Sequence, residues 1–130
     1  MELDELVASM PFAVASGVRL EAASRDEVRG TLEWSADRCT IGGALHGGAV
    51  MTLADSVAAI CAFLNLPEGA STSTIESKTN FFRGVRSGAV HVVSRPLHVG
   101  RRTIVVQSDL RDDADKRVAI VLQTQAVLAD

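Results

Sequence analysis

The stretch that decides the fold is Ala44-Leu45-His46-Gly47-Gly48-Ala49-Val50-Met51-Thr52-Leu53-Ala54-Asp55, and residues 56–66 continue its apolar character. Its apolar residues recur at the spacing of a helix, which predicts one helix over 44–66 that Pro67 and Gly69 end. Because nearly every side of this helix is apolar, it either spans a membrane or is wrapped by the rest of the chain. The strands predicted after it, together with the charge of Asp55 at its middle, favour the wrapped arrangement.

Alternating polarity on both sides of the helix predicts an antiparallel sheet. Residues 18–34 predict two short strands, or one hairpin, with a break at 24–26. Further strands are predicted over 71–82, 88–99, 103–111 and 117–128, and the short turns between them predict an antiparallel meander. A sheet with one apolar face can curl around an apolar helix and bury it. The sequence therefore predicts an α+β fold, with a curved antiparallel sheet wrapped around one long central helix.

More specific predictions concern the first helix, two aromatic residues and the later strands. A short amphipathic helix over the first ten residues is expected to end at Pro11, and Pro96 implies a bulge or an edge position in its strand. Phe12 and Trp34 are expected in the core or in a subunit contact. One face of the last strand is predicted to carry Val118, Ile120, Leu122, Thr124, Ala126 and Leu128.

Composition favours a soluble, cytoplasmic protein. The 130 residues fit one domain over 1–130, and 47% hydrophobic with 22% charged residues exclude disorder, collagen and coiled coil. A net charge of −3 with 4% aromatic residues argues against a nucleic-acid partner. The acidic start at residues 1–5 differs from a signal peptide, and no membrane partner is expected. Cys39 and Cys61 lack the spacing of a metal site, so no metal or other cofactor is expected.

Asp55 is the one formally charged residue between Cys39 and Pro67. Burial of a lone carboxylate is costly, and proteins usually offset the cost with a protonated state or a dedicated partner. The same surroundings suit a general base, so Asp55 is a candidate catalytic residue. The alternative is that Asp55 faces water at a helix end or pairs with an arginine from a strand.

Glycine density marks the start of the helix. Four of the ten glycines lie within residues 42–48, as Gly42-Gly43 and Gly47-Gly48. Uncovered backbone N–H groups at the positive end of a helix dipole would stabilise a negative oxygen, although such glycines can also serve only a loop with unusual backbone angles. Gly47 and Asp55 are about 12 Å apart along a helix, so no single carbonyl group reaches both within one chain. If both act in one reaction, the sequence predicts a symmetric dimer with its site at the interface.

The stretch 44–55 resembles the signature of the hotdog-fold acyl-CoA thioesterases, and in particular the branch named for the phenylacetic-acid degradation thioesterase. Its specific features are His46-Gly47-Gly48 and an aspartate nine positions after the histidine. Residues 74–83, with the sequence Thr-Ile-Glu-Ser-Lys-Thr-Asn-Phe-Phe-Arg, resemble the strand that follows the helix in that branch. The resemblance extends over about residues 15–128.

The resemblance implies a hotdog fold in which two subunits join their sheets edge to edge and share active sites, with two such dimers forming a homotetramer. It implies hydrolysis of the thioester of an aryl- or fatty acyl-CoA. Carried over by position, Asp55 is the general base or nucleophile, the Gly47 N–H holds the oxyanion, and His46 shapes that turn or assists binding. Gly48 belongs with the expected substrate-binding residues.

The chain departs from the family pattern at two positions. The family often has Asn six residues before the histidine, where this chain has Thr40, whose hydroxyl can donate one hydrogen bond. The family also tends to have Pro where Gly84 follows Arg83. The hydroxyl that orients the water in related enzymes corresponds to Ser73 or Thr74, and both stay open.

CoA carries several phosphate charges, so cations are expected near the mouth of its pocket. The candidates are the arginines at strand ends and turns, which are Arg83, Arg86, Arg101 and Arg102. Each of them can instead be a solvated surface residue.

Two other functions are compatible with the same fold. A hotdog acyl dehydratase or hydratase relies on a catalytic histidine paired with an acid in a different motif, which this sequence lacks. A non-catalytic acyl-CoA binding or sensor protein has no need of a buried carboxylate, so Asp55 together with the glycine turn favours an enzyme. Cys61 has no histidine partner in register and is predicted to be a buried small hydrophobe rather than a nucleophile.

Overall fold

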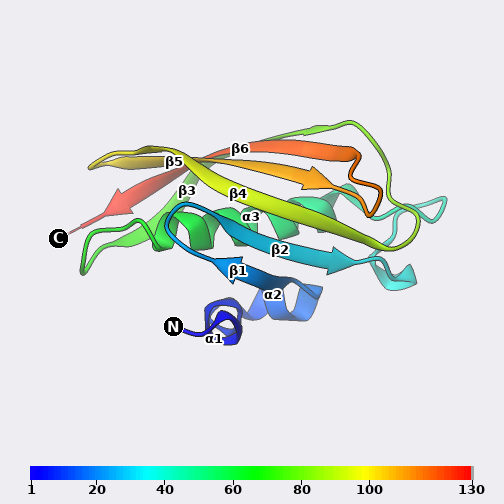
Figure 1. Ribbon diagram of the computed structural model, residues 1–130, viewed down its shortest axis with the longest axis horizontal. Helices are drawn as coiled ribbons and strands as arrows, with labels where there is room; N and C mark the ends of the chain where they lie inside the picture. The colour runs from blue at the N-terminus through cyan, green and yellow to red at the C-terminus, as the bar shows by residue number, and fades with distance from the viewer. Residues whose placement is uncertain (130) are drawn as a thin grey trace.

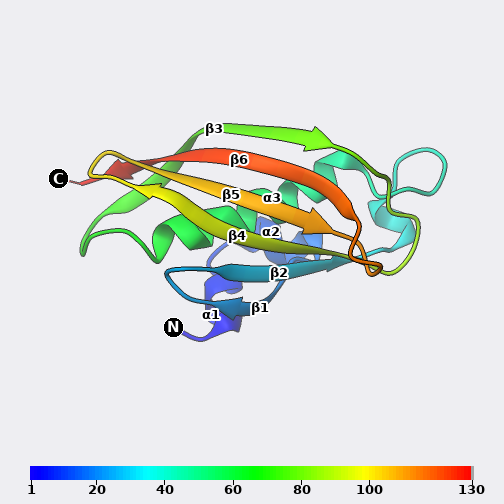
Figure 2. The same ribbon diagram turned by 45° about the horizontal axis from the view of Figure 1, so that its top comes forward.

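The computed structural model describes residues 1–129 as one six-stranded antiparallel sheet with a long helix packed on it (Figure 1). The strands are β1 (Arg19–Ala23), β2 (Val28–Glu33), β3 (Ser71–Phe81), β4 (Ala89–Val99), β5 (Thr103–Arg111) and β6 (Arg117–Leu128). The helices are α1 (Leu3–Ala8), α2 (Pro11–Ser16), the short 3-10 helix η1 (Ala36–Arg38) and α3 (Gly47–Phe63). The order across the sheet is β1-β2-β4-β5-β6-β3, and every neighbouring pair is antiparallel (Figure 2).

The sheet curves over α3 and buries one side of that helix (Figure 1). Leu53 and Val57 of α3 are fully buried, as are Ile104 and Leu110 on the facing strand β5. Gly30 on β2 allows the close approach, because a Cβ there would lie 2.7 Å from Val57 Cγ2. Each buried side chain of this size contributes about 1.5–3 kcal/mol, so this interface is the core of the fold. The predicted α+β class, with a curved antiparallel sheet around one long helix, is confirmed.

α3 begins three residues later and ends three residues earlier than the predicted 44–66. Leu45 stays extended before the helix, where its N–H donates to the Val85 carbonyl at 2.8 Å and it pairs with Cys39 in an isolated β-bridge. His46 also has extended backbone angles and is the N-cap. The helix therefore begins at the glycine pair itself.

β3 lies at the edge of the sheet beside β6, so the predicted meander is wrong for this strand. Within residues 1–129, the meander consists of β4, β5 and β6. Residues 82–88 instead carry the chain across the end of the sheet: the Phe82 N–H donates to the Val118 carbonyl at 2.8 Å, and the Gly88 carbonyl accepts from Trp34 at 2.8 Å. Alternating polarity predicts that a segment is a strand, but the choice of neighbour depends on contacts that are distant in the sequence.

Apart from Val118, which is buried in the core, the face of β6 predicted to be its apolar side is not the one that packs on α3. Leu122 is 42% exposed and Leu128 is 49% exposed, because they lie on the outer face of the sheet. The inward row contains Val121, Gln123 and Gln125, all of which are buried. The two glutamines interrupt the apolar pattern of the inward row, so the outer row appears more hydrophobic in the sequence.

Two prolines act only in part as predicted. Pro11 begins the second helix, α2, instead of only ending the first, because proline suits the first helical position. Phe12 on α2 is 72% exposed, so the core alternative is wrong for this residue and a subunit contact stays a prediction, whereas Trp34 packs against the core. The β4–β5 register shifts between Pro96 and His98, which confirms the bulge. The edge alternative is wrong, because β4 lies between β2 and β5.

Candidate active site

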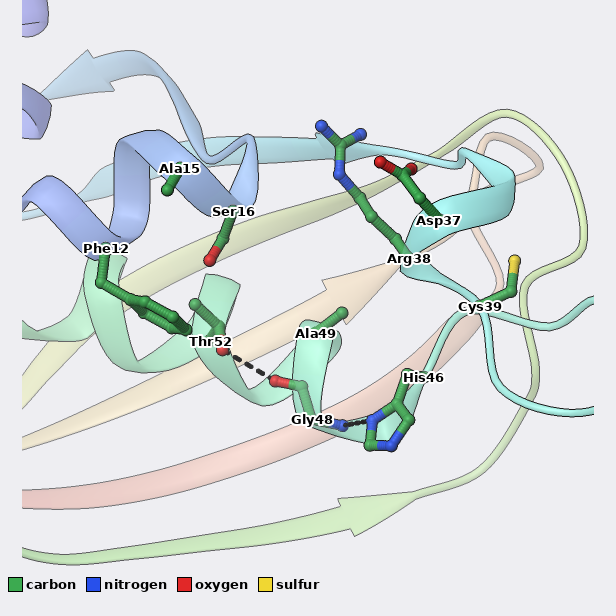
Figure 3. Close-up of a pocket in the computed structure, with 10 residues that line it drawn as sticks. All are labelled: Phe12, Ala15, Ser16, Asp37, Arg38, Cys39, His46, Gly48, Ala49 and Thr52. Carbon is green, nitrogen blue, oxygen red and sulfur yellow. Dashed lines mark hydrogen bonds between the residues drawn. The ribbon is translucent and has the colours of Figure 1, made fainter.

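His46 closes the N-terminus of α3. Its Nδ1 accepts a hydrogen bond of 2.8 Å from the Gly48 N–H (Figure 3). Because Nδ1 is the acceptor, the proton of the neutral ring lies on Nε2, where it can be donated to a ligand. The ring also occupies the space beside position 48, since a Cβ on Gly48 would lie 2.9 Å from His46 Nδ1. The cap therefore depends on glycine at position 48.

The backbone N–H of Gly47 has no hydrogen-bond partner among residues 1–129. It lies at the first position of a helix of 17 residues, where the helix dipole favours negative charge. A Cβ on Gly47 would lie 3.2 Å from Cζ of Phe81, so a side chain there would press on this ring of β3. Position 47 thus offers an uncovered donor suited to a negative oxygen.

Asp55 lies on the side of α3 that the sheet leaves open. Its neighbours Ala54 and Ser56 are buried, but Asp55 itself is exposed, so its predicted burial is wrong within one chain. The uncovered side of the helix also carries the exposed side chains of Met51 and Phe63. The sheet ends at β3, so the side of α3 beyond that strand is left uncovered (Figure 2).

The partner of Asp55 is an amide rather than an arginine. Gln123 on β6 donates its Nε2 to Asp55 Oδ1 at 2.9 Å. The same nitrogen donates to Gln125 Oε1 at 2.8 Å, and the Thr74 hydroxyl donates to that oxygen at 2.6 Å. Sequence reasoning missed both glutamines, although two amides within an apolar strand are a readable signal of a buried polar network.

A groove runs along the open side of α3. Its first part is a pocket of about 440 Å³, lined by Gly48, Met51, Thr52, Asp55, Thr74 and Ser77. Its second part, of about 580 Å³, contains His46 and Arg38 (Figure 3). The two parts adjoin, because Gly48 and Thr52 line both. Gly48 at the start of the helix and the Asp55 carboxylate therefore line one pocket.

The two candidate hydroxyls lie on different faces of β3. Thr74 lines the pocket with Asp55, whereas Ser73 is its neighbour on the outer face of the sheet. The β3–β6 register shifts between Thr74 and Glu76, and because of this bulge Ser77 also faces the pocket. Ser77 was missed from the sequence, because simple alternation from Thr74 gives the wrong phase beyond the bulge.

The remaining predicted site residues are dispersed in one chain. Thr40 lies in the exposed loop before α3 and lines neither part of the groove. Arg83 and Arg86 lie in the loop after β3, at the end of the sheet where α3 begins. Arg101 and Arg102 lie in the β4–β5 turn at the opposite end, about 27 Å away along β5. One chain therefore does not bring the four arginines together.

Cys61 is fully buried on α3, and this burial raises the pKa of its thiol to about 11. The thiol is therefore protonated near neutral pH, which confirms the prediction of a small hydrophobe rather than a nucleophile. Within residues 1–129, no three or more His, Cys, Asp or Glu side chains are grouped so that they could hold a metal ion. In the same part of the chain, no helix has both the length and the apolar character needed to cross a bilayer.

The fold and the site together define a class of protein, in which a curved antiparallel sheet covers one helix with a His-Gly-Gly start and a carboxylate nine residues later. Residues 42–119 match the family model described as the thioesterase superfamily, and the chain belongs to this family. Thioesterase PA1618 from Pseudomonas aeruginosa, solved as a mutant, has a TM-score of 0.92 and 30% identity, over 98% of this chain and 94% of that one. Thioesterase HI1161 from Haemophilus influenzae has a TM-score of 0.92 and 27% identity, over 99% and 92%.

A further relative is the 1,4-dihydroxy-2-naphthoyl-CoA hydrolase of Escherichia coli. It is 29% identical over 111 residues, which are 85% of this chain and 82% of that protein. Family membership confirms the predicted hotdog fold and the predicted class of enzyme, a thioester hydrolase. The family model describes the superfamily as a whole, so the phenylacetic-acid branch stays a prediction.

Proposed function

We propose that the chain hydrolyses the thioester of an aryl- or fatty acyl-CoA to the free acid and CoA. The observation that carries this proposal is that the Asp55 carboxylate, anchored by Gln123, opens onto a groove that leads to the glycine pair of the helix start. The Escherichia coli relative, named as a hydrolase of a naphthoyl-CoA, supports CoA as the thiol and an aryl group among the acyl groups. We place this activity in the cytoplasm, with no membrane or nucleic-acid partner.

The complete site lies between two copies of the chain in this proposal. Gly47 and Asp55 are about 12 Å apart along α3, too far for one carbonyl group to touch both. β3 is an edge strand of 11 residues, and an unpaired strand edge is a template for another strand. A second copy that pairs its own β3 antiparallel to this one would extend the sheet and cover the open side of α3.

Two-fold symmetry would then bring the two halves of the site together. Phe81, at one end of β3, packs beside Gly47, whereas Thr74, nearer the other end, lines the pocket of Asp55. In an antiparallel pair centred between Ser77 and Lys78 of β3, Phe81 would lie opposite the partner's Thr74. The helix start of one subunit, with its Thr40 loop, would therefore meet the Asp55 pocket of the other. Two such dimers form the proposed homotetramer.

The chemistry follows from the groups that meet there. Asp55 acts on the thioester carbon directly or through a water; in the water route, the water oxygen bonds to the carbonyl carbon and its proton goes to Asp55. The carbon–sulfur bond then breaks, and the proton passes to the CoA sulfur. The Gly47 N–H holds the oxyanion, a contact that contributes about 10²–10³ in rate. His46 Nε2–H is a second donor at the same turn, and Gly48 lines the proposed substrate pocket.

The coenzyme would lie at the end of the sheet where α3 begins. Arg83 and Arg86 are at this end of their own chain. The antiparallel pairing would bring the β4–β5 turn of the second copy, with its own Arg101 and Arg102, toward the same end. These guanidinium groups are proposed to bind the CoA phosphates. Ser73 has no part in the proposed site, because it lies on the outer face of β3.

Release of free thiol from a panel of aryl- and aliphatic acyl-CoA substrates tests this proposal. The wild type is expected to release thiol, and Asp55→Asn should lose about 10²-fold or more of the rate. Asp26→Asn, which changes an exposed aspartate in the β1–β2 turn, is the matched control and should keep full activity. No thiol from any substrate would overturn the hydrolysis. A strict monomer in size-exclusion chromatography with full activity would overturn the shared site.

A further inference from the structure

Two buried amides lie beneath Asp55. Gln123 and Gln125 on β6 are 0% and 1% exposed, although amides are costly to bury without partners. Both lie in the inward-facing row of β6. The preceding residue of that row, Val121, is apolar and also buried. Packing alone does not explain two amides at these positions. Their hydrogen bonds show what else they do.

Gln123 donates hydrogen bonds in two directions within this network. Gln123 Nε2 donates one hydrogen to Asp55 Oδ1 at 2.9 Å and the other to Gln125 Oε1 at 2.8 Å. Gln125 Oε1 also accepts from the Thr74 hydroxyl at 2.6 Å. Gln125 Nε2 donates to Thr72 Oγ1 at 3.1 Å, and that hydroxyl donates to a backbone carbonyl at 2.8 Å. One bond from Gln123 therefore ends at the Asp55 carboxylate, and the other leads through Gln125 and Thr72 to a carbonyl of the strand backbone.

The Gln123 amide has one usable orientation. If it were turned over, its carbonyl oxygen would face the Asp55 carboxylate and the Gln125 carbonyl, which are both acceptors. In the orientation found, both hydrogens of Nε2 are used, while Oε1 has no partner among residues 1–129. A buried carbonyl without a donor is unfavourable. The bonds made by Nε2 must therefore hold the amide in place.

We propose that Gln123 is a positioning residue, which fixes Oδ1 of Asp55 and leaves Oδ2 to take the proton of the attacking water. This inference rests on the proposed function. The hydrogen of the Thr74 hydroxyl is committed to Gln125, so Thr74 offers only lone pairs to the pocket. Oδ2 of Asp55 and Oγ1 of Thr74 are then two hydrogen-bond acceptors in the same pocket. A water that donates a hydrogen to each turns its own lone pair toward the substrate, which favours the water route over direct attack.

Gln123→Met tests the positioning role, because methionine keeps the length and burial of the side chain and removes the donor. We expect kcat to fall about 10- to 100-fold, while KM changes less than about two-fold, since no contact to the substrate is removed. Gln107→Met is the matched control. Gln107 lies on the neighbouring strand β5, opposite the outward-facing Leu122, and should tolerate the change with unaltered kcat.

Asp55→Asn, measured in the same series, distinguishes a failure of the positioning role from a failure of the proposed function. If Asp55→Asn loses activity while Gln123→Met keeps the wild-type kcat, the positioning role is wrong and the proposed function stands. If Asp55→Asn is fully active, the proposed catalytic role of Asp55 is wrong, and the positioning role fails with it. A purely structural role of Gln123 would lower the melting temperature and leave kcat unchanged.

The side-chain amide spectrum gives a readout that needs neither activity nor the Gln123 variant. In ¹⁵N–¹H spectra, the Gln123 Nε2 hydrogens are expected to exchange slowly with solvent, because the residue is fully buried. Asp55→Ala removes the acceptor and should shift one of these resonances, while the Gln107 amide stays in place. Unshifted Gln123 resonances in Asp55→Ala would overturn the contact on which the positioning role depends.

Discussion

The ring of His46 fills the space that a Cβ of Gly48 would occupy, while its Nδ1 accepts the Gly48 N–H at 2.8 Å. The two glycines at the helix start therefore differ in what they do. Gly48 makes room for the ring that caps the helix, and Gly47 keeps an N–H uncovered beside Phe81. They should respond differently to substitution.

Gly48→Ala is expected to break the cap with little net change in stability. The new Cβ would lie 2.9 Å from His46 Nδ1 and displace the ring, so the lost cap costs about 1 kcal/mol. Alanine within a helix is favoured over glycine by up to about 1 kcal/mol, which offsets this cost. The free energy of unfolding in urea should change by less than about 0.5 kcal/mol, whereas thiol release should fall about ten-fold because the donor at Nε2 moves.

His46→Ala is the matched control for the cap. It loses the cap with no compensating change at position 48 and should be destabilised by about 1 kcal/mol. When Gly48→Ala is added to His46→Ala, no ring opposes the new Cβ, and about 1 kcal/mol of stability should return. An identical effect of Gly48→Ala in both backgrounds would mean that the ring and position 48 are not coupled.

Gly47→Pro should remove the oxyanion donor and leave the helix intact. Position 47 is the first residue of α3, where proline is favoured, and the extended backbone of His46 suits a residue before proline. We expect kcat to fall about 10²–10³-fold, as for the loss of one oxyanion donor. Gly47→Ala keeps the N–H and places a Cβ 3.2 Å from Phe81, so it controls for steric effects and should retain most of the activity. Equal losses in both variants would contradict the assignment of the N–H.

Thr74→Val should lower activity more than Ser73→Ala. Valine keeps the shape of Thr74 but removes the hydroxyl that bonds to Gln125 beside the Asp55 pocket, which predicts a loss of about three- to ten-fold in kcat. Ser73 lies on the outer face of β3, and its replacement should leave kcat unchanged. The comparison is made by thiol release from one acyl-CoA. A loss confined to Ser73→Ala would contradict the register of β3.

The hydroxyls of Ser73 and Thr74 also show how much of the site could be predicted from the sequence. The spacing of apolar residues predicted the helix that carries Asp55, because that helix is long and apolar and is followed by Pro67 and Gly69. The sequence could not decide between Ser73 and Thr74, because only the structure shows which face of β3 is inward. Ser77 was missed because the bulge after Thr74 shifts the alternation by one residue.

The errors on β6 and Asp55 have different physical origins. Gln123 occupies an inward position where an apolar residue is expected, since its amide serves Asp55 and not the packing of the core. Asp55 was expected to be buried because it is a lone charge on an apolar helix. Its exposure depends on β3 lying at the edge of the sheet, and strand order comes from long-range contacts that local patterns do not contain.

Cys61→Ala should alter the pH dependence of stability. Burial raises the pKa of the Cys61 thiol from 9.0 to about 11. The unfolded chain loses this proton near pH 9 and the folded chain only near pH 11, so the stabilisation is complete below pH 9 and is lost as the pH rises to 11. The loss is on the order of 2 kcal/mol. Over this window, the unfolding free energy in urea should fall more steeply for the wild type than for Cys61→Ala, and parallel curves would contradict the raised pKa.

Mixing two inactive variants tests whether each site is shared between subunits. Asp55→Asn and Gly47→Pro homodimers each lack one half of both sites. In a mixed dimer, one site combines the intact Gly47 of one chain with the intact Asp55 of the other, while the second site has both defects. Random reassembly of equal amounts makes half of the dimers mixed, with one working site of two, so about a quarter of the wild-type activity should return.

The measurement is thiol release after the two variants are unfolded in urea and refolded together, compared with the same variants refolded apart. Recovery depends on the geometry of α3, in which Gly47 and Asp55 are separated by about 12 Å along one helix. If the site were instead formed within one chain, every chain in the mixture would carry one of the two defects. No combination of subunits could then restore activity, and the mixture would stay as inactive as its components.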